Sequence, residues 1–527
     1  MRSIIHPDTD HPRVDFPALY NAAADLLALN QAWPQKVAYV QADTGQTLSY
    51  GDLEQQARRW AQVLLADGFE PEQRVLLAMH DTLEWPVAFL GSILAGVVPI
   101  AVNTLLTTQD FEFMLRDSRA KGLITSCALL PQFAPLLDGR LAASLKQVYV
   151  GGQGEAQGHA RMAERIAGQA PLLQATPTRP DDPCFWLYSS GSTGSPKGTV
   201  HLHSHLMPTA ALYAHRILGI RHEDVVFSAA KLFFAYGLGN ALTFPMSVGA
   251  TTVLWPQRPT PEDVFGVLKR HQPSIFYGVP TLYASLLAHP SRPAASELAL
   301  RVCTSAGEAL PAEIGHSWQQ AHGCEILDGI GSTEMLHIFL SNRPGRVKYG
   351  STGQAVPGYE LRLINDEGHE CAEGELGELQ IKGPSAALLY WGNRAKTKST
   401  FCGEWTRSGD KYSRDAQGYY TYGGRTDDML KVGGIYVSPF EVEASLMTHS
   451  AVLEAAVIGV ADEEGLIKPK AYVVLKGGHS CTPDDLKAHV KSQLAPYKYP
   501  RWIEIIEELP KTATGKIQRF KLRATRT

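Results

Sequence analysis

The stretch Tyr188-Ser189-Ser190-Gly191-Ser192-Thr193-Gly194-Ser195-Pro196-Lys197-Gly198 decides how the rest of the chain is interpreted. The apolar segment 184–188 leads into it and predicts a buried strand. Gly191 and Gly194 allow the backbone to approach a ligand closely and to turn its N–H groups inward. Lys197 adds a positive charge, and the following residues add hydroxyl donors: Ser189, Ser190, Ser192 and Thr193. The stretch therefore predicts a phosphate-binding loop.

A Walker A loop is excluded by the spacing. That motif needs Gly-x-x-x-x-Gly-Lys-Ser/Thr. Counting from Gly191, Pro196 replaces the second glycine, and Gly198 stands where the metal-binding hydroxyl belongs. A flexible Ser/Gly linker is the other interpretation of the composition. Such a linker rarely follows an aromatic strand directly, and it rarely ends in Pro-Lys-Gly. The phosphate-loop interpretation is therefore favoured.

Length and composition limit the class of protein. A chain of 527 residues is too long for one simple core and predicts two or more domains. The net charge of −4 gives no basic excess that would favour nucleic acid or an anionic membrane as a partner. The seven cysteines are scattered and include no Cys-x-x-Cys. This usage favours free thiols in a reducing cytoplasm over disulfides or zinc.

No segment resembles a targeting or membrane-spanning sequence. The first 20 residues carry several aspartates and no apolar core, so we expect no signal peptide. The longest apolar run, 87–102, is interrupted by glycines and a proline and is too short to span a membrane. We interpret it as a buried helix followed by a turn.

Strand and helix patterns alternate in the N-terminal part. The segment 47–53 predicts a strand end and a helix cap, and 75–79 predicts another strand, followed by a helix over about 85–95. This alternation predicts an α/β layer fold. The segment 151–180, rich in Gly, Gln, Ala and Pro, predicts a weakly structured connection.

Aromatic and histidine-containing segments each permit two interpretations. The segment 231–240 joins aromatic residues to glycines, which suits either plain core or a pocket wall. His337 lies in an apolar run and is either a satisfied core histidine or a pocket residue. His201, His203 and His205 alternate, but no cysteine or acid of matching spacing accompanies them, so zinc is disfavoured.

Further polar motifs follow in order. They are 303–310, which we expect to follow a strand and open a helix, then Asp328-Gly329-Ile330-Gly331-Ser332-Thr333-Glu334, 405–410, 424–434 and Leu509-Pro510-Lys511-Thr512-Ala513-Thr514-Gly515-Lys516-Ile517. Each has an ordinary alternative when taken alone: a solvated loop aspartate for Asp410, a polar turn for 424–434, and an exposed tail lysine for Lys516.

Taken together, these motifs resemble those of the adenylate-forming superfamily, which includes acyl-CoA synthetases, adenylation domains of peptide synthetases and firefly-type luciferases. The matched motifs run from Thr47 to Lys516 in the order and spacing of that family. The resemblance implies an α/β fold with a large layered α/β N-terminal domain, residues 1–426, that holds the ATP and acyl pockets. It also implies a small mobile α+β C-terminal domain, residues 427–527, that carries the catalytic lysine.

The resemblance implies a role for each matched residue. Lys516, Lys197, Thr333 and Glu334 would be catalytic, and Glu334 would hold Mg²⁺. ATP would be bound by Ser189, Ser190, Gly191, Ser192, Thr193, Gly194, Ala306, Gly307, Glu308, Asp328, Gly329, Ile330, Asp410 and Arg425. Ile330 stands where the family has a tyrosine. Asp427 would be the hinge, and Lys431, Gly433 and Gly434 would border the tunnel for the pantetheine arm of CoA.

Two segments narrow the class of acid that we expect as substrate. Residues 233–239 and 332–338 look like those of bacterial benzoate–CoA and 4-hydroxybenzoate–CoA ligases. The acyl pocket implied is short and flat and is formed by Phe234, Ala235, Tyr236, Gly331, His337 and Ile338. We therefore expect an ATP-dependent aryl-CoA ligase that converts benzoate, or a close analogue, to its CoA thioester through an acyl-AMP.

The expected co-substrates are ATP, with Mg²⁺, and coenzyme A. We expect free CoA rather than a fused carrier domain because only the segment 517–527 follows Lys516. The alternatives are an aryl-adenylating enzyme that loads a carrier protein, a short- or medium-chain aliphatic acyl-CoA synthetase, a luciferase-like oxygenase and a non-enzymatic nucleotide-binding relative. We expect a cytoplasmic monomer or homodimer with no nucleic acid or membrane partner.

Overall fold

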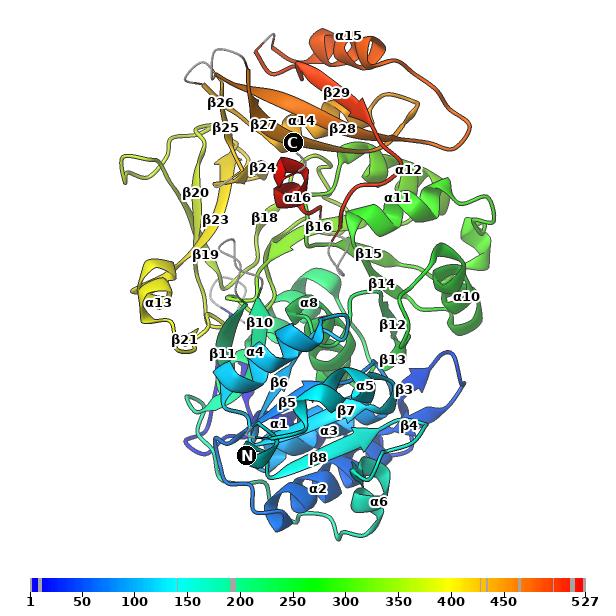
Figure 1. Ribbon diagram of the computed structural model, residues 1–527, viewed down its shortest axis with the longest axis vertical. Helices are drawn as coiled ribbons and strands as arrows, with labels where there is room; N and C mark the ends of the chain where they lie inside the picture. Colours follow the sequence, from blue (N-terminus) through cyan, green and yellow to red (C-terminus); the bar gives the residue numbers. More distant parts are fainter. Residues whose placement is uncertain are drawn as a thin grey trace.

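The computed structural model describes residues 2–7, 12–139, 141–189, 196–426, 428–432, 435–462, 466–495, 497–511 and 517–524. Figure 1 shows a large lower body that contains the N-terminus and a smaller upper unit that contains the C-terminal end. The helices are α1 (Ala22–Ala28), α2 (Tyr50–Ala66), α3 (Glu84–Leu94), α4 (Thr108–Ser118), α5 (Leu130–Phe133), α6 (Met162–Ala167), α7 (Leu206–Thr209), η5 (Ala210–Leu218), α8 (Ala235–Leu238), η6 (Gly239–Thr243), α9 (Phe244–Val248), α10 (Pro261–His271), α11 (Pro280–Ala288), α12 (Ala312–His322), α13 (Arg394–Thr400), α14 (Pro439–Met447), α15 (Pro483–Gln493) and α16 (Arg519–Ala524).

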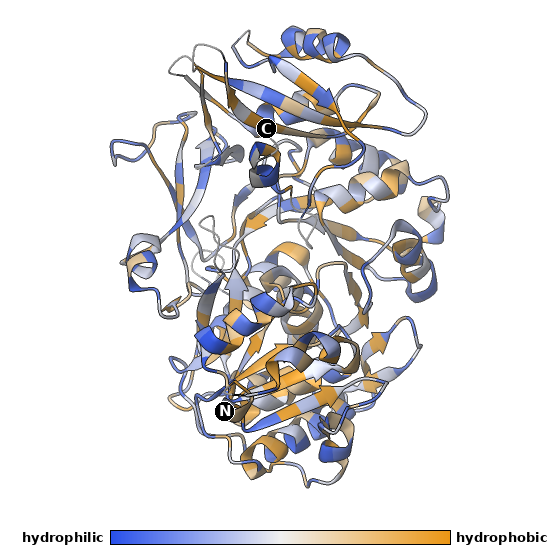
Figure 2. Cartoon of the chain, in the orientation of Figure 1, coloured by the Kyte–Doolittle hydropathy of each residue, from blue (hydrophilic) through white to orange (hydrophobic). Residues whose placement is uncertain are grey.

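An eight-stranded sheet carries the phosphate-loop strand. Its order is β21-β11-β10-β6-β5-β7-β8-β9. The strands are β21 (Leu389–Tyr390), β11 (Lys197–Leu202), β10 (Pro183–Ser189), β6 (Val98–Ala101), β5 (Arg74–Ala78), β7 (Gly122–Ser126), β8 (Gln147–Gly151) and β9 (Ala160–Arg161). Strands β5 to β8 run parallel to their neighbours and are almost wholly buried, as apolar runs predict for strands covered on both faces. Figure 2 shows the hydrophobic residues along them.

A nine-stranded sheet carries the other predicted nucleotide segments. Its order is β18-β17-β16-β15-β14-β12-β13-β3-β4. The strands are β18 (Gln354–Ala355), β17 (Ile338–Ser341), β16 (Ile326–Gly331), β15 (Val302–Ser305), β14 (Ile275–Gly278), β12 (Val225–Ser228), β13 (Thr251–Leu254), β3 (Val37–Gln41) and β4 (Thr47–Ser49). Because β14, β15 and β16 are parallel, the segments that follow their carboxyl ends lie along one edge of the sheet.

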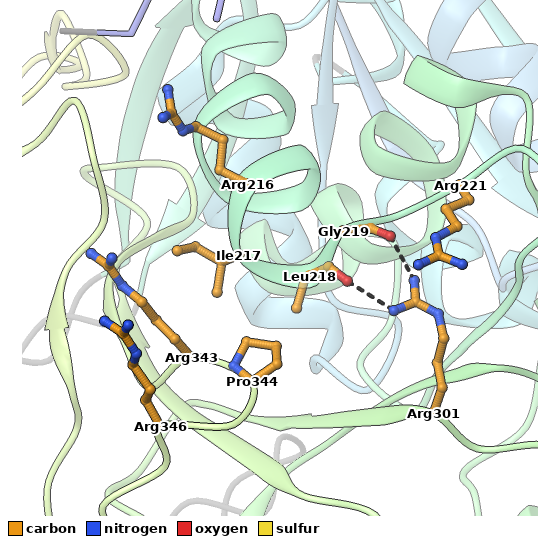
Figure 3. A pocket seen from close by; sticks show the side chains of 9 residues that line it. All are labelled: Arg216, Ile217, Leu218, Gly219, Arg221, Arg301, Arg343, Pro344 and Arg346. Atoms are coloured by element: carbon orange, nitrogen blue, oxygen red, sulfur yellow. Dashed lines mark hydrogen bonds between the residues drawn. The ribbon is translucent and has the colours of Figure 1, made fainter. Parts of the chain in front are cut away.

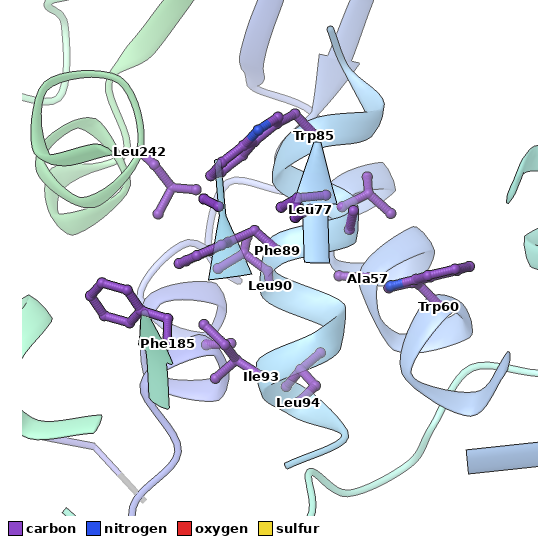
Figure 4. Packing of buried hydrophobic residues seen from close by; sticks show 14 of the residues in the cluster. Ala57, Trp60, Leu77, Trp85, Phe89, Leu90, Ile93, Leu94, Phe185 and Leu242 are labelled. Carbon is purple, nitrogen blue, oxygen red and sulfur yellow. The ribbon is translucent and has the colours of Figure 1, made fainter. Parts of the chain in front are cut away.

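The core between these sheets explains the helix pattern in the sequence. Helix α2 begins after Ser49, whose side chain accepts a hydrogen bond from the Asp52 N–H, as the predicted cap requires. It packs closely on α3 because Gly91 has no side chain: a Cβ there would lie 2.5 Å from the Ala57 carbonyl oxygen. Aromatic rings continue the packing toward β10 (Figure 4), with Phe89 and Phe185 5.6 Å apart between ring centroids.

A third sheet has the order β19-β20-β23-β22, and β24 also pairs with β23. Its strands are β19 (Glu360–Ile364), β20 (Gly377–Lys382), β23 (Trp405–Arg414), β22 (Phe401–Cys402) and β24 (Tyr420–Arg425). Its inner face packs on the core that the nine-stranded sheet also lines, through side chains such as Leu379 and Tyr412. It therefore belongs to the large body.

The C-terminal unit has its own small core. A hairpin of β25 (Leu430–Val432) and β26 (Ile435–Val437) precedes a sheet of β27 (Val452–Ala461), β28 (Ile467–Leu475) and β29 (Trp502–Ile505). Helices α14 and α15 contribute Val442, Leu446 and Val490 to that core. The layered α/β body and this α+β unit confirm the predicted fold class. The boundary between 426 and 427 stays a prediction, and Asp427 lies outside the described residues.

Two expected local features differ. The segment 303–310 does not open a helix, because Cys303, Thr304 and Ser305 are themselves in β15 and α12 begins only at Ala312, after Pro311. The connection 151–180 is more structured than its composition predicts, since α6 packs on α2 and buries Met162 and Ile166. In both places tertiary packing outweighs local composition. In the part of the chain that the structure describes, we find no helix with the length and hydropathy of a transmembrane span.

Candidate functional site

The base of the predicted phosphate loop is a hairpin. Strand β10 ends at Ser189 and β11 begins at Lys197, and the two residues are paired in the antiparallel register. Among the described residues, the half-buried Ser189 hydroxyl has no hydrogen-bond partner, as expected of a donor reserved for a ligand. The rest of the predicted loop, Ser190, Gly191, Ser192, Thr193 and Gly194, lies outside the described residues.

Tyr390 joins Lys197 to Glu334. Strand β21 pairs with β11, with Tyr390 opposite Thr199, and this places Tyr390 beside the loop. The Tyr390 hydroxyl donates a 2.6 Å hydrogen bond to Glu334 Oε1. The Lys197 Nζ lies 4.9 Å from the centroid of the same ring. Burial and the neighbouring Glu334 raise the pKa of Tyr390, so its hydroxyl stays protonated and remains a donor.

Positive charge is concentrated around Lys197. Burial lowers the pKa of Lys197, Glu334 raises it in part, and Lys396 and Arg425 lower it further. Lys396 comes from α13 and Arg425 from the end of β24. A half-buried lysine that faces two other cations suits a site that receives a polyanion.

A buried histidine supports the Thr333–Glu334 segment. His201 Nε2 lies 2.8 Å from the Thr333 carbonyl oxygen and must donate its proton there. Burial lowers the pKa of His201 to about 4, so the ring is neutral. Its other nitrogen lies 3.1 Å from His205 Nδ1, and its face stacks on Phe185. The His203 ring instead accepts from the Ala22 N–H, so the three alternating histidines serve the packing around the site.

The segment after β15 and the strand β16 form the predicted adenine region. Ala306 is buried, and Gly307 has a φ of +98°, which favours glycine. Asp328 is buried beside Ser305 in the parallel register, and burial raises its pKa to about 7. Asp328 Oδ1 has no partner among the described residues. Gly329 and Ile330 follow it on β16.

Asp410 and Arg425 face each other on β23 and β24. The Arg425 Nη1 donates to Asp410 Oδ1 over 3.1 Å and to the Ser408 carbonyl over 3.2 Å. Asp410 is only 8% exposed and lies on a strand, which excludes the alternative of a solvated loop aspartate. The two residues thus lie side by side, and their role in binding ribose stays a prediction.

The predicted acyl residues converge from two segments. Phe234 precedes α8, which contains Ala235 and Tyr236, and the Tyr236 hydroxyl is 2.5 Å from the Thr304 hydroxyl. His337 Nε2 lies 3.3 Å from the Tyr236 carbonyl and 3.2 Å from Asn240 Oδ1, so it carries the donated proton. Burial lowers the pKa of His337 to about 3, and the ring is neutral.

Close packing fixes the His337 ring. It lies 4.4 Å from the Phe244 ring and 5.6 Å from the Tyr236 ring. A Cβ on Gly239 would lie 2.3 Å from His337 Cδ2, so a larger residue there would have to displace the ring. A Cβ on Gly331 would likewise lie 2.6 Å from the His337 carbonyl oxygen. Ile338 is 1% exposed and lies in the core, and its role in the acyl pocket stays a prediction.

The C-terminal segment reaches the turn that is predicted to bind adenine. The Ile517 N–H donates a 2.9 Å hydrogen bond to Glu308 Oε1. Lys516 itself lies outside the described residues, as do Asp427, Gly433 and Gly434, and Lys431 is described only as part of the β25 backbone. Helix α16 is tied to the unit by the ion pair of Arg519 with Glu443, at 2.8 Å.

The residues fit the implied ligands. Unpartnered oxygens of Ser189 and Asp328 suit a nucleotide, and the cations around Lys197 suit its phosphates. Within the described ranges, His, Cys, Asp and Glu side chains nowhere form a group of three or more that could hold a metal ion. Mg²⁺ needs none, since it binds through one or two carboxylates together with substrate phosphates. Glu334 can supply that carboxylate.

The sequence argument missed several residues of this site. Tyr390, His201, Lys396 and Asn240 each contact or face a predicted residue. Tyr390 follows a short apolar run with no motif, and Lys396 lies in a basic helix, so neither carried a signal. His201 was noticed only as a disfavoured zinc ligand.

Comparisons with known proteins show the family of the chain. The family model of the AMP-binding enzymes matches residues 28–391, and that of the AMP-binding enzyme C-terminal domain matches 441–516. The benzoate–CoA ligase of Thauera aromatica is 58% identical over 97% of each chain. The crystal structure of a benzoate CoA ligase from Burkholderia xenovorans LB400 is 55% identical with a TM-score of 0.90, covering 96% of this chain and 100% of that one. That of the anthranilate CoA ligase AuaEII in complex with anthranoyl-AMP is 42% identical with a TM-score of 0.92, covering 97% and 98%.

Proposed function

Since the chain belongs to the AMP-binding enzyme family, we propose that it is an ATP-dependent aryl-CoA ligase that acts on benzoate or a close analogue. The products are the CoA thioester, AMP and pyrophosphate. The observation that carries the proposal is that Tyr390 contacts both Lys197 and Glu334, and so joins them in one site. The segment that contains Glu334 continues to His337, which belongs to the proposed acyl pocket. The names of the relatives, ligases of benzoate and anthranilate with CoA, support the substrate class.

In the first step the carboxylate attacks the α-phosphorus of ATP. An acyl–oxygen–phosphorus bond forms, the bond to the β-phosphate oxygen breaks, and pyrophosphate leaves. The protein's task is to neutralise charge on the phosphates rather than to form a covalent intermediate. Lys197, supported by the neighbouring Lys396 and Arg425, provides positive charge at the phosphate loop. Asp410 is positioned to accept the ribose hydroxyls, beside Arg425.

Mg²⁺ bound with ATP would neutralise part of the phosphate charge. Glu334 is the residue that would hold it. Two contacts orient that carboxylate: the Tyr390 hydroxyl binds Oε1, and His201 holds the carbonyl of the preceding residue, Thr333. Both partners are buried, so the carboxylate is positioned before the nucleotide arrives.

Lys516 is assigned to the space between the two anions that react. The Ile517–Glu308 hydrogen bond supports this assignment, because it brings the residue next to Lys516 to the adenine turn. A lysine between carboxylate and α-phosphate offsets their mutual repulsion.

In the second step the CoA thiol loses its proton to solvent and attacks the acyl carbon. A thioester bond forms, the bond from the acyl carbon to the phosphate oxygen breaks, and AMP leaves with that electron pair. We assign rotation of the C-terminal unit about Asp427 to this step, with Lys431, Gly433 and Gly434 then bordering the pantetheine path. That rotation would withdraw Lys516. The C-terminal unit would thus present two faces in turn to the same acyl pocket, one for adenylation and one for thioester formation.

The acyl pocket favours a flat ring. Tyr236 and His337 present aromatic rings that hydrogen bonds hold in place, and burial keeps His337 neutral. A neutral wall does not bind a second charge, which agrees with a substrate whose only charge is the reacting carboxylate. Phe234, Ala235, Gly331 and Ile338 complete the proposed wall.

The experiment is AMP formation with ATP, Mg²⁺ and CoA across benzoate, 4-hydroxybenzoate, 2-aminobenzoate, phenylacetate, cinnamate, hexanoate and acetate. We expect a sharp preference for benzoate that depends on CoA. A preference for the aliphatic acids would remove Tyr236 and His337 from the pocket but leave the adenylation chemistry. Turnover without CoA, on an added carrier protein, would contradict the choice of acceptor. We further propose a cytoplasmic monomer or homodimer, which size-exclusion chromatography with light scattering tests.

A further inference from the structure

An arginine-lined cavity of about 460 Å³ lies away from the site described above. It is an open hollow between the end of η5, the loop before β12, the residue that precedes β15 and the loop after β17 (Figure 3). Its lining residues are Arg216, Ile217, Leu218, Gly219, Arg221, Arg301, Arg343, Pro344 and Arg346. Five of them are arginines and none is acidic, while the others supply an apolar floor.

One arginine is firmly anchored. Arg301 binds the buried Asp224 at 2.6 Å and also donates to the carbonyls of Leu218 and Gly219, at 3.0 and 2.9 Å. These bonds balance its charge and hold its planar guanidinium in one orientation. In Figure 3 the guanidinium of Arg221 lies beside it.

Each side of the cavity also carries arginine charge that is not balanced in the described part of the chain. Within the described ranges, no carboxylate pairs with Arg221, Arg343 or Arg346. Arg343 donates to the Ala355 carbonyl, but its Nε is buried without a partner among the described residues. Burial and the like charges of Arg346 and Arg216 lower the pKa of Arg343. A half-buried charge kept among like charges is costly unless an anion accompanies it.

We propose that this cavity binds a small phosphate-rich anion. Its volume falls within the usual range of small-molecule sites. Guanidinium groups bind phosphate oxygens in pairs, through forks that match their geometry. Figure 3 shows two pairs of arginines on different sides of the cavity, Arg343 with Arg346 and Arg221 with Arg301, and this number of guanidinium groups suits an anion with several phosphate groups rather than one with a single charge.

The cavity is separate from the nucleotide site. Arg301 immediately precedes β15, whereas the adenine turn that starts at Ala306 follows its carboxyl end. The strand has four residues and spans roughly 13 Å at the usual rise per residue. The two sites are thus at opposite edges of one sheet, and an anion in the cavity would not compete directly with ATP.

The test is calorimetric titration of the whole enzyme with inorganic tripolyphosphate. We compare wild type, R343Q/R346Q and the control R258Q/R270Q, which removes the same charge from exposed positions outside the cavity. We expect wild type and control to bind tripolyphosphate at one site beyond the nucleotide site, and R343Q/R346Q to bind there at least tenfold more weakly. Binding at the nucleotide site is common to all three proteins.

Two results would overturn the proposal: equal stoichiometry and affinity in R343Q/R346Q and wild type, or a single tripolyphosphate site in wild type from which ATP displaces the anion. If R343Q/R346Q does not fold, R221Q on the other wall must show the same loss. A parallel titration with adenosine 3′,5′-bisphosphate distinguishes the source, since tighter binding than tripolyphosphate indicates a nucleotide phosphate and weaker binding an inorganic one.

Discussion

Replacing Tyr390 with phenylalanine isolates the hydrogen bond that orients Glu334. The substitution removes the hydroxyl that donates to Glu334 Oε1 over 2.6 Å. It keeps the ring, and with it the contact with the Lys197 ammonium at 4.9 Å and the packing on Phe401 at 5.3 Å. The change therefore affects the carboxylate and leaves the aromatic packing in place.

The magnitude follows from the charge and burial of the bond. A hydrogen bond to a charged group contributes about 1.5–3 kcal/mol. Tyr390 is 3% exposed, but Glu334 is only half-buried, so water can replace part of what is lost. We expect a loss near the lower limit, about 1.5 kcal/mol, or roughly tenfold in kcat/KM for ATP.

The assay is pyrophosphate release with benzoate as the concentrations of ATP and Mg²⁺ are varied. Y390F should need more Mg²⁺ for half-maximal rate, because its carboxylate is no longer positioned. Thioester formation from supplied benzoyl-AMP should be unchanged, since that step uses neither the β- and γ-phosphates nor the metal carboxylate. A loss of packing would reduce both steps.

The matched control is Y149F. Tyr149 is also buried and also donates to a carboxylate, Asp67, over 2.6 Å, far along the chain from the site. Y149F should lower the free energy of unfolding and leave the Mg²⁺ dependence as in wild type. The reasoning is refuted if Y390F releases pyrophosphate within twofold of wild type at limiting ATP, or if Y149F changes the Mg²⁺ dependence equally.

Three other predictions test separate parts of the site. K516A should abolish adenylation but retain thioester formation from supplied benzoyl-AMP, and equal loss of both half-reactions would contradict the assignment of two active faces. G239A should raise the KM for benzoate severalfold, because the new methyl group must displace the His337 ring at an overpacking cost of about 1–3 kcal/mol. In the control G266A, also in a helix, the new Cβ meets nothing within 4 Å. An equal change in KM in G266A would contradict the assignment of His337 to the pocket. Burial raises the pKa of Asp328 from 3.8 to about 7, so between these values the folded state keeps a proton that the unfolded state has released, and stability falls as pH rises. Urea unfolding should therefore show wild type losing stability relative to D328N from pH 4 to pH 7, and a constant difference would show that Asp328 is not buried as described.

The sequence by itself determined those parts of the protein in which local order carries the signal. The phosphate-loop stretch, with Lys197, and the Thr333–Glu334 pair were recognised because their chemistry lies in consecutive residues. The start of helix α2 was predicted because its cap, Ser49, precedes it directly in the segment 47–53. Strand β5 was predicted from a short apolar run, because a strand that is buried on both faces does not alternate apolar and polar residues.

Only the tertiary structure decided which of these pieces meet. Tyr390 reaches Glu334 across 56 positions, His201 reaches Thr333 across 132, and Ile517 reaches Glu308 across 209. Each contact depends on the register in which two strands pair or on how one unit rests on another, and neither is encoded in a local pattern. The arginine cavity has the same origin, because its charges come from separate segments that the nine-stranded sheet brings together. A linear motif identifies groups that react, whereas the positions of their supporting partners follow from long-range packing.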